Sequence, residues 1–156
     1  MYQPGHCGVA LALYAPVTGV LAASGSTSTA FLGAGIVLAL TMLPDLDTRT
    51  DRVRHRGPTH SIVFAAFVGL LTGVGGGLLA GANGAEFGGL VGALAIVAHL
   101  LADVITPMGI RPFWPLSDRK LTFDIVLASD TRANAVLFVF GVVSAGGSLF
   151  LGNQFA

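Results

Sequence analysis

The sequence predicts an all-α integral membrane protein, with about five transmembrane helices in one bundle and a polar site at the cytoplasmic edge. Hydrophobic residues make up 53% of the 156 residues and charged residues only 10%, a balance typical of membrane proteins. Five apolar stretches approach or reach the roughly 20 residues that a helix needs to cross the hydrocarbon layer. We therefore treat residues 1–156 as a single transmembrane helical domain.

Short separators and breakers in the sequence set the limits of the five spans. Small polar turns, SGSTST and GANGAE, follow the first and third spans. Pro44 stops the second span, because proline cannot continue a helix. The third span is rich in glycine, and small residues allow helices in a membrane to approach closely. The predicted spans are residues 7–24, 29–43, 61–82, 86–107 and 132–152.

The two longer loops, 44–60 and 109–131, hold almost every charge in the chain. Arginine and lysine are enriched in cytoplasmic loops, so both loops are predicted to face the cytoplasm, with the N-terminus inside and the C-terminus outside. The result is a multi-pass protein of the cell (inner) membrane. The formal net charge is zero, which leaves no basic face for nucleic acid, and the single cysteine excludes both an internal disulfide and a thiolate-rich zinc site.

The fourth span carries two ionisable residues inside an apolar segment, AIVAHLLADVITP. His99 and Asp103 are four residues apart and hence lie on one helical face. Ionisable groups inside a bilayer cost about 3 kcal/mol on insertion scales, so they persist mainly where they pair, line a cavity or bind an ion. A hydrogen bond between His99 and Asp103 that only holds helices together is the alternative.

The topology brings further polar residues to the same membrane edge. Asp45 and Asp47 end the second span, His60 begins the third, His6 precedes the first, and His55 lies across the Gly57-Pro58 bend from His60. Every histidine of the chain is thus predicted at one depth. Each residue also has an ordinary explanation, since aspartates after Pro44 often make turn hydrogen bonds and Thr59 or Ser61 suits a helix cap.

Imidazoles and carboxylates without thiolates suit zinc, manganese or iron, and these residues suffice for one or two ions. Such an ion lowers the pKa of a bound water and neutralises charge on a reacting oxygen, which makes hydrolysis the natural reaction class. Asp47, His55 and His60 are the candidate catalytic residues, with His55 either a ligand or a general acid or base. The candidate metal ligands are His6, Asp45, Asp47, His60, His99 and Asp103.

Basic residues of the cytoplasmic loops are candidates for holding an anionic substrate. Arginine binds phosphate and carboxylate bidentately. The alternative for the arginines of RTDRVRHR is that they anchor the topology against anionic headgroups. The substrate-binding candidates are Arg56, Arg111, Arg119 and Lys120.

The motifs together resemble those of a known family, the small membrane-bound metal-dependent hydrolases of bacteria and archaea, which includes a LexA-regulated inner-membrane member. The resemblance is carried by GHCG, LPDLDT, HRGPTHS and HLLADVITPMGIRPFWPLSDRK, and covers residues 1 to about 125. It implies a metal and catalytic group formed by His6, Asp45, Asp47, His55, His60, His99 and Asp103. The predicted fifth span carries no motif.

These observations favour a metal-dependent hydrolase that uses a metal-activated water on a phosphoester of a lipid or lipid-linked substrate. An amide or ester bond is an alternative, because the same water would attack either. A proton or divalent-cation transporter with a His/Asp relay is the rival from another class, and it predicts polar residues through the full membrane depth. A structural protein whose metal only holds helices together is a third hypothesis.

Overall fold

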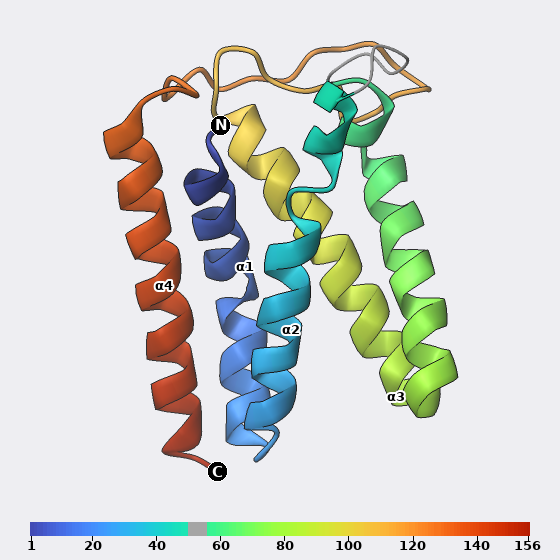
Figure 1. Cartoon of the computed structure of the whole chain (residues 1–156), viewed down its shortest axis with the longest axis vertical. Coiled ribbons are helices and arrows are strands. Elements are labelled where there is room, and N and C mark those ends of the chain that lie inside the picture. Colours follow the sequence, from blue (N-terminus) through green and yellow to red (C-terminus); the bar gives the residue numbers. More distant parts are fainter. Residues whose placement is uncertain (50–55) are drawn as a thin grey trace.

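The computed structural model describes residues 1–49 and 56–156. These residues form four α-helices and two short 3-10 helices, with only an isolated bridge between Ile110 and Leu121 as β-structure (Figure 1). The predicted all-α membrane class is confirmed, because four helical segments are long and apolar enough to cross a bilayer. In chain order the elements are α1 (Gln3–Ala23), α2 (Thr27–Leu40), η1 (Pro44–Arg49), η2 (Pro58–His60), α3 (Ile62–Val104) and α4 (Thr131–Asn153).

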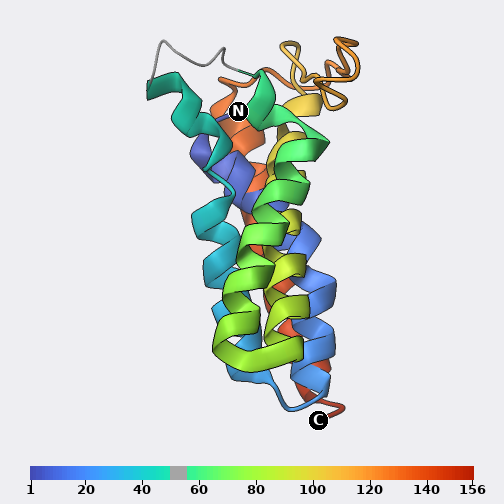
Figure 2. The same ribbon diagram turned by 90° about the vertical axis from the view of Figure 1, so that its right-hand side faces the viewer.

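Helix α3 is a hairpin that contains both the third and the fourth predicted spans. Ala80 and Gly81 leave helical geometry, and Gly81 has a φ of 67°, a region that glycine enters without steric penalty. The chain reverses there, and the arms 62–79 and 82–104 run back along each other (Figure 2). A Cβ on Gly76 would overlap the carbonyl of Gly84, so the arms meet backbone to backbone near the turn. With α3 counted as two arms, the four helices therefore form five helical segments that run along the bundle.

Glycine also brings α1 and α4 together. A Cβ on Gly8 would overlap the backbone of Leu137, and a Cβ on Gly141 would overlap the backbone of Gly8. Any larger side chain at these two positions would force the helices apart. Close approach of this kind is how helices associate in a bilayer, where burial of apolar surface gives no driving force between them.

Two helix boundaries differ from the prediction in ways that affect the site. Helix α1 begins at Gln3 instead of residue 7, with Pro4 in its first turn, where the missing N–H of proline costs nothing. His6 is therefore part of the helix and does not precede it. Helix α2 ends at Leu40, before the predicted limit of 43, and Thr41 is its C-cap. The chain then enters η1 at Pro44, which places Asp45 and Asp47 in a tight 3-10 turn.

The N-terminus, η1, η2 and the loop between α3 and α4 lie at one end of the bundle, and the C-terminus lies at the other (Figure 1). Because five is an odd number of crossings, the two termini must lie at opposite ends of the bundle. The exposed large side chains of the helices are mostly Leu, Val, Ile and Phe, which indicates a lipid environment around the bundle. The cytoplasmic position of the polar end stays a prediction.

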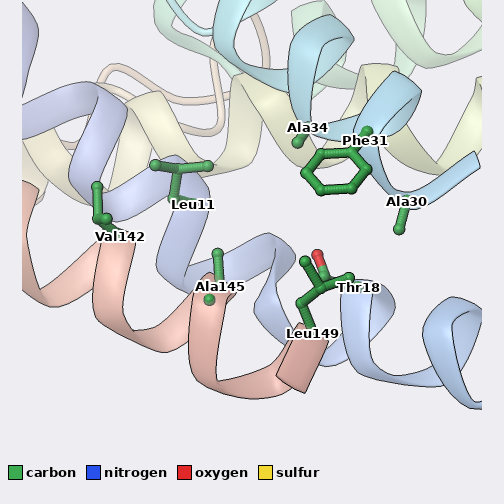
Figure 3. A pocket seen from close by; sticks show the side chains of 9 residues that line it. Leu11, Thr18, Ala30, Phe31, Ala34, Val142, Ala145 and Leu149 are labelled. Atoms are coloured by element: carbon green, nitrogen blue, oxygen red, sulfur yellow. The ribbon is translucent and has the colours of Figure 1, made fainter. Parts of the chain in front are cut away.

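An apolar cavity of about 270 Å³ opens between α1, α2 and α4 (Figure 3). Leu11, Phe31, Val142 and Leu149 contribute much of its wall, and Thr18 is its only polar side chain. No titratable group lines this cavity, so its walls offer no catalytic or metal-binding side chain. Side chains of that kind lie at the polar end of the bundle.

Candidate metal centre

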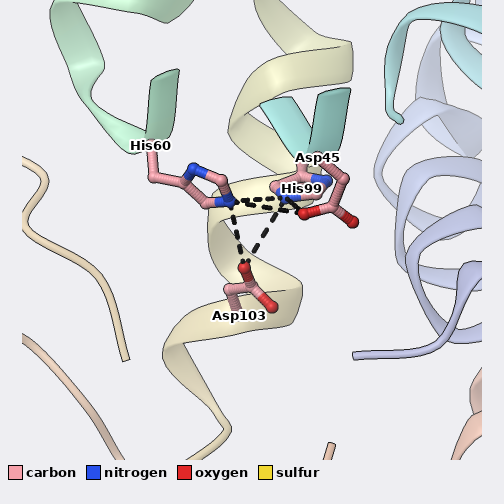
Figure 4. A group of neighbouring side chains, drawn as sticks. All are labelled: Asp45, His60, His99 and Asp103. Carbon is pink, nitrogen blue, oxygen red and sulfur yellow. Dashed lines mark hydrogen bonds and ion pairs between the residues drawn. The ribbon is translucent and has the colours of Figure 1, made fainter. Parts of the chain in front are cut away.

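Four side chains from separate parts of the chain converge between η1, η2 and the second arm of α3 (Figure 4). One ligand atom from each lies within 4.8 Å of the others. The Nε2 atoms of His60 and His99 are 3.1 Å apart, and each lies 3.4 to 3.6 Å from one oxygen of Asp45 and one of Asp103. The four residues are Asp45, His60, His99 and Asp103, and we call them the four-ligand group.

The end of α2 fixes the orientation of His99. The last carbonyls of a helix have no partner within the helix, and the carbonyl of Thr41 instead lies 2.7 Å from His99 Nδ1. A carbonyl oxygen only accepts hydrogen bonds, so Nδ1 must carry the proton and donate it to Thr41. In the neutral imidazole the lone pair is therefore on Nε2, which faces the four-ligand group.

Thr59 and Asp47 orient His60 in the same way. The Thr59 hydroxyl donates to Asp47 Oδ2 at 2.6 Å and lies 3.0 Å from His60 Nδ1. Since the hydroxyl proton is committed to the carboxylate, Thr59 accepts from Nδ1, and Asp47 Oδ2 is itself 3.4 Å from that nitrogen. The lone pair of His60 is again on Nε2. Asp47 thus lies behind the ring, where an acidic partner typically supports a metal-binding histidine.

The two inward-facing Nε2 atoms and the two carboxylates favour a positive charge between them. The Nε2 atoms are 3.1 Å apart and repel each other while both carry lone pairs, and Asp103 Oδ2 is buried with no hydrogen-bond donor among the described residues. Burial opposes protonation of His60, but the carboxylates of Asp103 and Asp45 outweigh it and raise the pKa of this imidazole. A tetrahedral zinc with bonds of about 2.0–2.2 Å has ligand atoms about 3.3–3.6 Å apart. The four histidine–carboxylate separations of 3.4–3.6 Å fall in this range, and the 3.1 Å between the two Nε2 atoms is slightly shorter.

The other oxygen of Asp103 is held by cationic groups. The Arg56 guanidinium lies 2.9 Å from Oδ1, and the amino group of Met1 lies 3.1 Å from the same atom. Arg56 also donates to Thr106 Oγ1 and to the carbonyl of Gly109. Its φ is 58°, an unusual backbone region for an arginine, and its side chain is buried. Arg56 is thus a fixed positive charge beside the four-ligand group.

His6 lies directly against the four-ligand group. Its ring stacks on that of His99, with 4.0 Å between centroids and 3° between planes. The ring is fully buried, and neither nitrogen has a hydrogen-bond partner among the described residues. Its Nε2 is 3.6 Å from Asp103 Oδ1 and 3.9 Å from Asp45 Oδ2. The predicted gathering of residues from α1, η1, η2 and α3 is therefore present.

In the part of the chain that the structure describes, three of the remaining predicted site residues, Arg111, Arg119 and Lys120, make no hydrogen bond or ion pair with the four-ligand group. Lys120 is exposed and donates to the carbonyl of Pro107, and Arg119 is exposed in the same loop. Arg111 is partly buried, and no ion pair joins it to the four-ligand group among residues 1–49 and 56–156. His55 lies outside the described residues, as do Arg52 and Arg54.

Two threonines contribute to the site in ways that the sequence did not predict. The backbone carbonyl of Thr41 accepts from His99, and the hydroxyl of Thr59 links His60 to Asp47. A carbonyl carries no signature in a sequence, so Thr41 could not have been found. Thr59 directly precedes His60, and this Thr-His pair was the available signal, although it suggested a helix cap. The cap is Ser61, whose hydroxyl accepts from the N–H of Phe64.

The helices and the buried histidines and aspartates define an all-α membrane protein with a candidate metal site at one end. Residues 1–154 of the 156 match a family model, YdjM inner membrane protein. The protein belongs to the YdjM inner membrane protein family, which confirms the expected membrane location. That description names no reaction. No curated protein and no solved structure matches the chain.

Proposed function

We propose that this protein is a membrane-bound hydrolase that depends on a divalent metal ion held by the four-ligand group. The observation that carries the proposal is the pair of inward-facing Nε2 lone pairs, fixed by hydrogen bonds on the opposite side of each ring. Both imidazoles are presented as ligands before any ion arrives. Zinc, manganese and iron all accept this set of nitrogen and oxygen donors.

A bound ion of this kind supplies a water of lowered pKa and a positive charge for the reacting oxygen. The chain contributes the geometry. Asp45 keeps 25% of its side chain exposed, whereas His60, His99 and Asp103 are buried, so the substrate approaches from the Asp45 side. The Arg56 guanidinium lies beside the four-ligand group, where its positive charge would balance that of an anionic group of the substrate.

A phosphoester of a lipid or lipid-linked molecule fits this setting best. The site lies at one end of a bundle whose outer surface is apolar, so an amphipathic substrate reaches it with its chains still in the bilayer. In the reaction the oxygen of water joins phosphorus, the ester P–O bond breaks, and the leaving alcohol takes a proton. An amide or ester bond is the alternative substrate.

Transport of protons or cations receives less support from the distribution of buried polar residues. A relay needs polar groups through the full membrane depth. Among the described residues, the buried polar and charged side chains lie near the polar end, except Thr18 and the hydroxyl of Tyr14 in α1. Metal-driven flux in proteoliposomes containing the purified protein would favour the transporter.

A metal that only ties the helices together is the stronger rival, because four protein ligands are typical of structural zinc sites. Two observations argue against a closed site. One ligand, Asp45, is partly exposed, and buried His6 lies beside the group with both of its nitrogens available among the described residues. Stable folding and metal content without turnover would favour the structural role.

The direct test incubates metal-loaded protein with a mixed lipid extract and follows phosphate-containing products by mass spectrometry. We expect products that disappear with a chelator and return when the metal is restored. Asp45→Ala should reduce turnover by at least 100-fold, whereas the exposed Asp118→Ala should not. Products that survive both chelation and Asp45→Ala would exclude a metal-dependent reaction at this site.

A further inference from the structure

The two carboxylates of the four-ligand group each turn one oxygen toward His60 and His99 and the other toward His6. Asp45 Oδ1 lies 3.5 Å from His99 Nε2, while Asp45 Oδ2 lies 3.9 Å from His6 Nε2. Asp103 Oδ2 lies 3.5 Å from His99 Nε2, while Asp103 Oδ1 lies 3.6 Å from His6 Nε2. Carboxylates that face two sets of nitrogen donors in this way are placed to bridge two ions.

We infer that the site holds two divalent cations, the second bound by His6 Nε2, Asp45 Oδ2 and Asp103 Oδ1. This inference rests on the proposed metal site and adds a second position to it. The unpartnered buried imidazole of His6 is the independent observation. Burial of a polar ring without hydrogen bonds costs free energy, which a metal ligand bond would recover.

The spacing of the stacked rings agrees with a pair of ions. His6 and His99 are parallel, 4.0 Å apart, and their Nε2 atoms both face Asp45 and Asp103. Ions bound to two parallel rings on the same side are separated by about the ring spacing. Ions in two-metal hydrolytic sites are about 3.5–4 Å apart.

The second position also differs from the first in the number of protein ligands. The four-ligand group surrounds one ion on four sides, whereas the His6 position has three protein ligands. Three is the number typical of catalytic zinc sites. Asp103 Oδ1 also contacts the Arg56 guanidinium at 2.9 Å and the Met1 amino group at 3.1 Å, so an ion at the His6 position would share this oxygen with two cationic groups and be held less tightly than the first ion. The His6 position is therefore the one that we expect to exchange ligands with the solvent.

The test counts metal in the full-length protein, purified in detergent, loaded with Mn²⁺ and freed of excess ion. We expect two ions per chain and the electron paramagnetic resonance spectrum of a coupled pair. His6→Gln and His6→Phe should each bind one ion with an uncoupled spectrum. The neighbouring Cys7→Ala should keep two. The Phe variant preserves a stacked ring without a ligand nitrogen, so it separates coordination by His6 from mere packing.

One ion in the native chain, or two coupled ions in both His6 variants, would overturn the inference. The native count decides the question even if a variant fails to fold. Because the count does not depend on turnover, the inference and the hydrolase proposal fail separately. Two bound ions without any hydrolysis would support the two-ion site and contradict the hydrolase proposal. Hydrolysis with only one bound ion would support the hydrolase proposal and contradict the two-ion site.

Discussion

At the residue scale, the site depends on which nitrogen of each histidine carries the proton. Thr41 and Thr59 settle this for His99 and His60, and both rings then present Nε2 inward. The sequence could predict that His99 and Asp103 share a helical face, because their spacing of four matches the helical repeat. It could not separate Asp45 from Asp47. A 3-10 helix has three residues per turn, so residues two apart point in different directions: Asp45 supplies an oxygen to the four-ligand group, and Asp47 contacts His60 from the Nδ1 side.

Replacement of Asp47 should weaken metal binding without abolishing it. In Asp47→Ala the Thr59 hydroxyl loses its acceptor and no longer fixes the proton of His60, so we expect a 10- to 100-fold lower affinity, as for other partners of metal-bound histidines. His99→Ala should bind no metal at the four-ligand group. Competition with a chelating dye measures both variants, with Asp118→Ala as the matched control.

The comparison between these variants decides the role of Asp47. If Asp47→Ala loses metal as completely as His99→Ala, Asp47 is a direct ligand, as the sequence analysis expected. If Asp47→Ala instead binds metal as tightly as Asp118→Ala, the hydrogen bond from Thr59 to Asp47 does not contribute to metal binding. Only a partial loss of metal affinity in Asp47→Ala agrees with the role in which Asp47 orients His60 without binding the metal itself.

At the scale of elements, hydropathy predicted the number and order of the helical segments and the bounds of α4 to within one residue, but not the start of α1, the end of α2 or the turn of α3. The turn was expected in GANGAE, residues 81–86, and the reversal occurs at its start, at Ala80 and Gly81, with the rest of the stretch already in the second arm. Small residues such as Ala82 and Gly84 are compatible with either state, so composition could not locate the turn. The early start of α1 likewise depends on Pro4, which is tolerated in a first turn.

The contact between Gly8 and Gly141 should determine how α1 and α4 pack. Gly141→Leu would push its side chain into the backbone of Gly8, and we expect a loss of about 1–3 kcal/mol of stability. At Gly147, on the same helix, an added Cβ would meet open space, so Gly147→Leu serves as the control. Thermal unfolding in detergent, followed by size-exclusion chromatography, measures the difference. Equal midpoints for the two variants would contradict close packing at Gly141.

At the scale of the whole molecule, topology explains why distant residues meet. Reversals after α1 and within α3 return the chain to the same end, so η1, η2 and the end of the second arm of α3 gather beside the start of α1. This much could be predicted from hydropathy and the placement of charges. The stacking of His6 on His99 could not, because it depends on the rotation of α1 about its own axis.

The predicted orientation can be tested with single cysteines in a Cys7→Ala background. Asp118→Cys lies in the loop at the polar end, and Gln154→Cys lies beyond α4 at the other end. Since basic loops remain cytoplasmic, a membrane-impermeant maleimide should label position 154 in intact cells and position 118 only in inverted vesicles. The opposite pattern would place the metal centre on the outer side.

The close contacts between the two arms of α3 extend from Gly76 and Gly84 beside the turn to Gly69 and Ala93, and the arms separate toward the polar end (Figure 1). At 1.5 Å per residue, His99 lies about 9 Å along the arm from Ala93. A tilt of about 5° beyond that last close contact would therefore displace His99 by about 0.8 Å, roughly four times the tolerance of a metal–ligand bond. Helix tilt responds to bilayer thickness. Comparing ion affinity in thin and thick bilayers would therefore show how firmly the hydrogen bond between Thr41 and His99 holds the second arm of α3 in place.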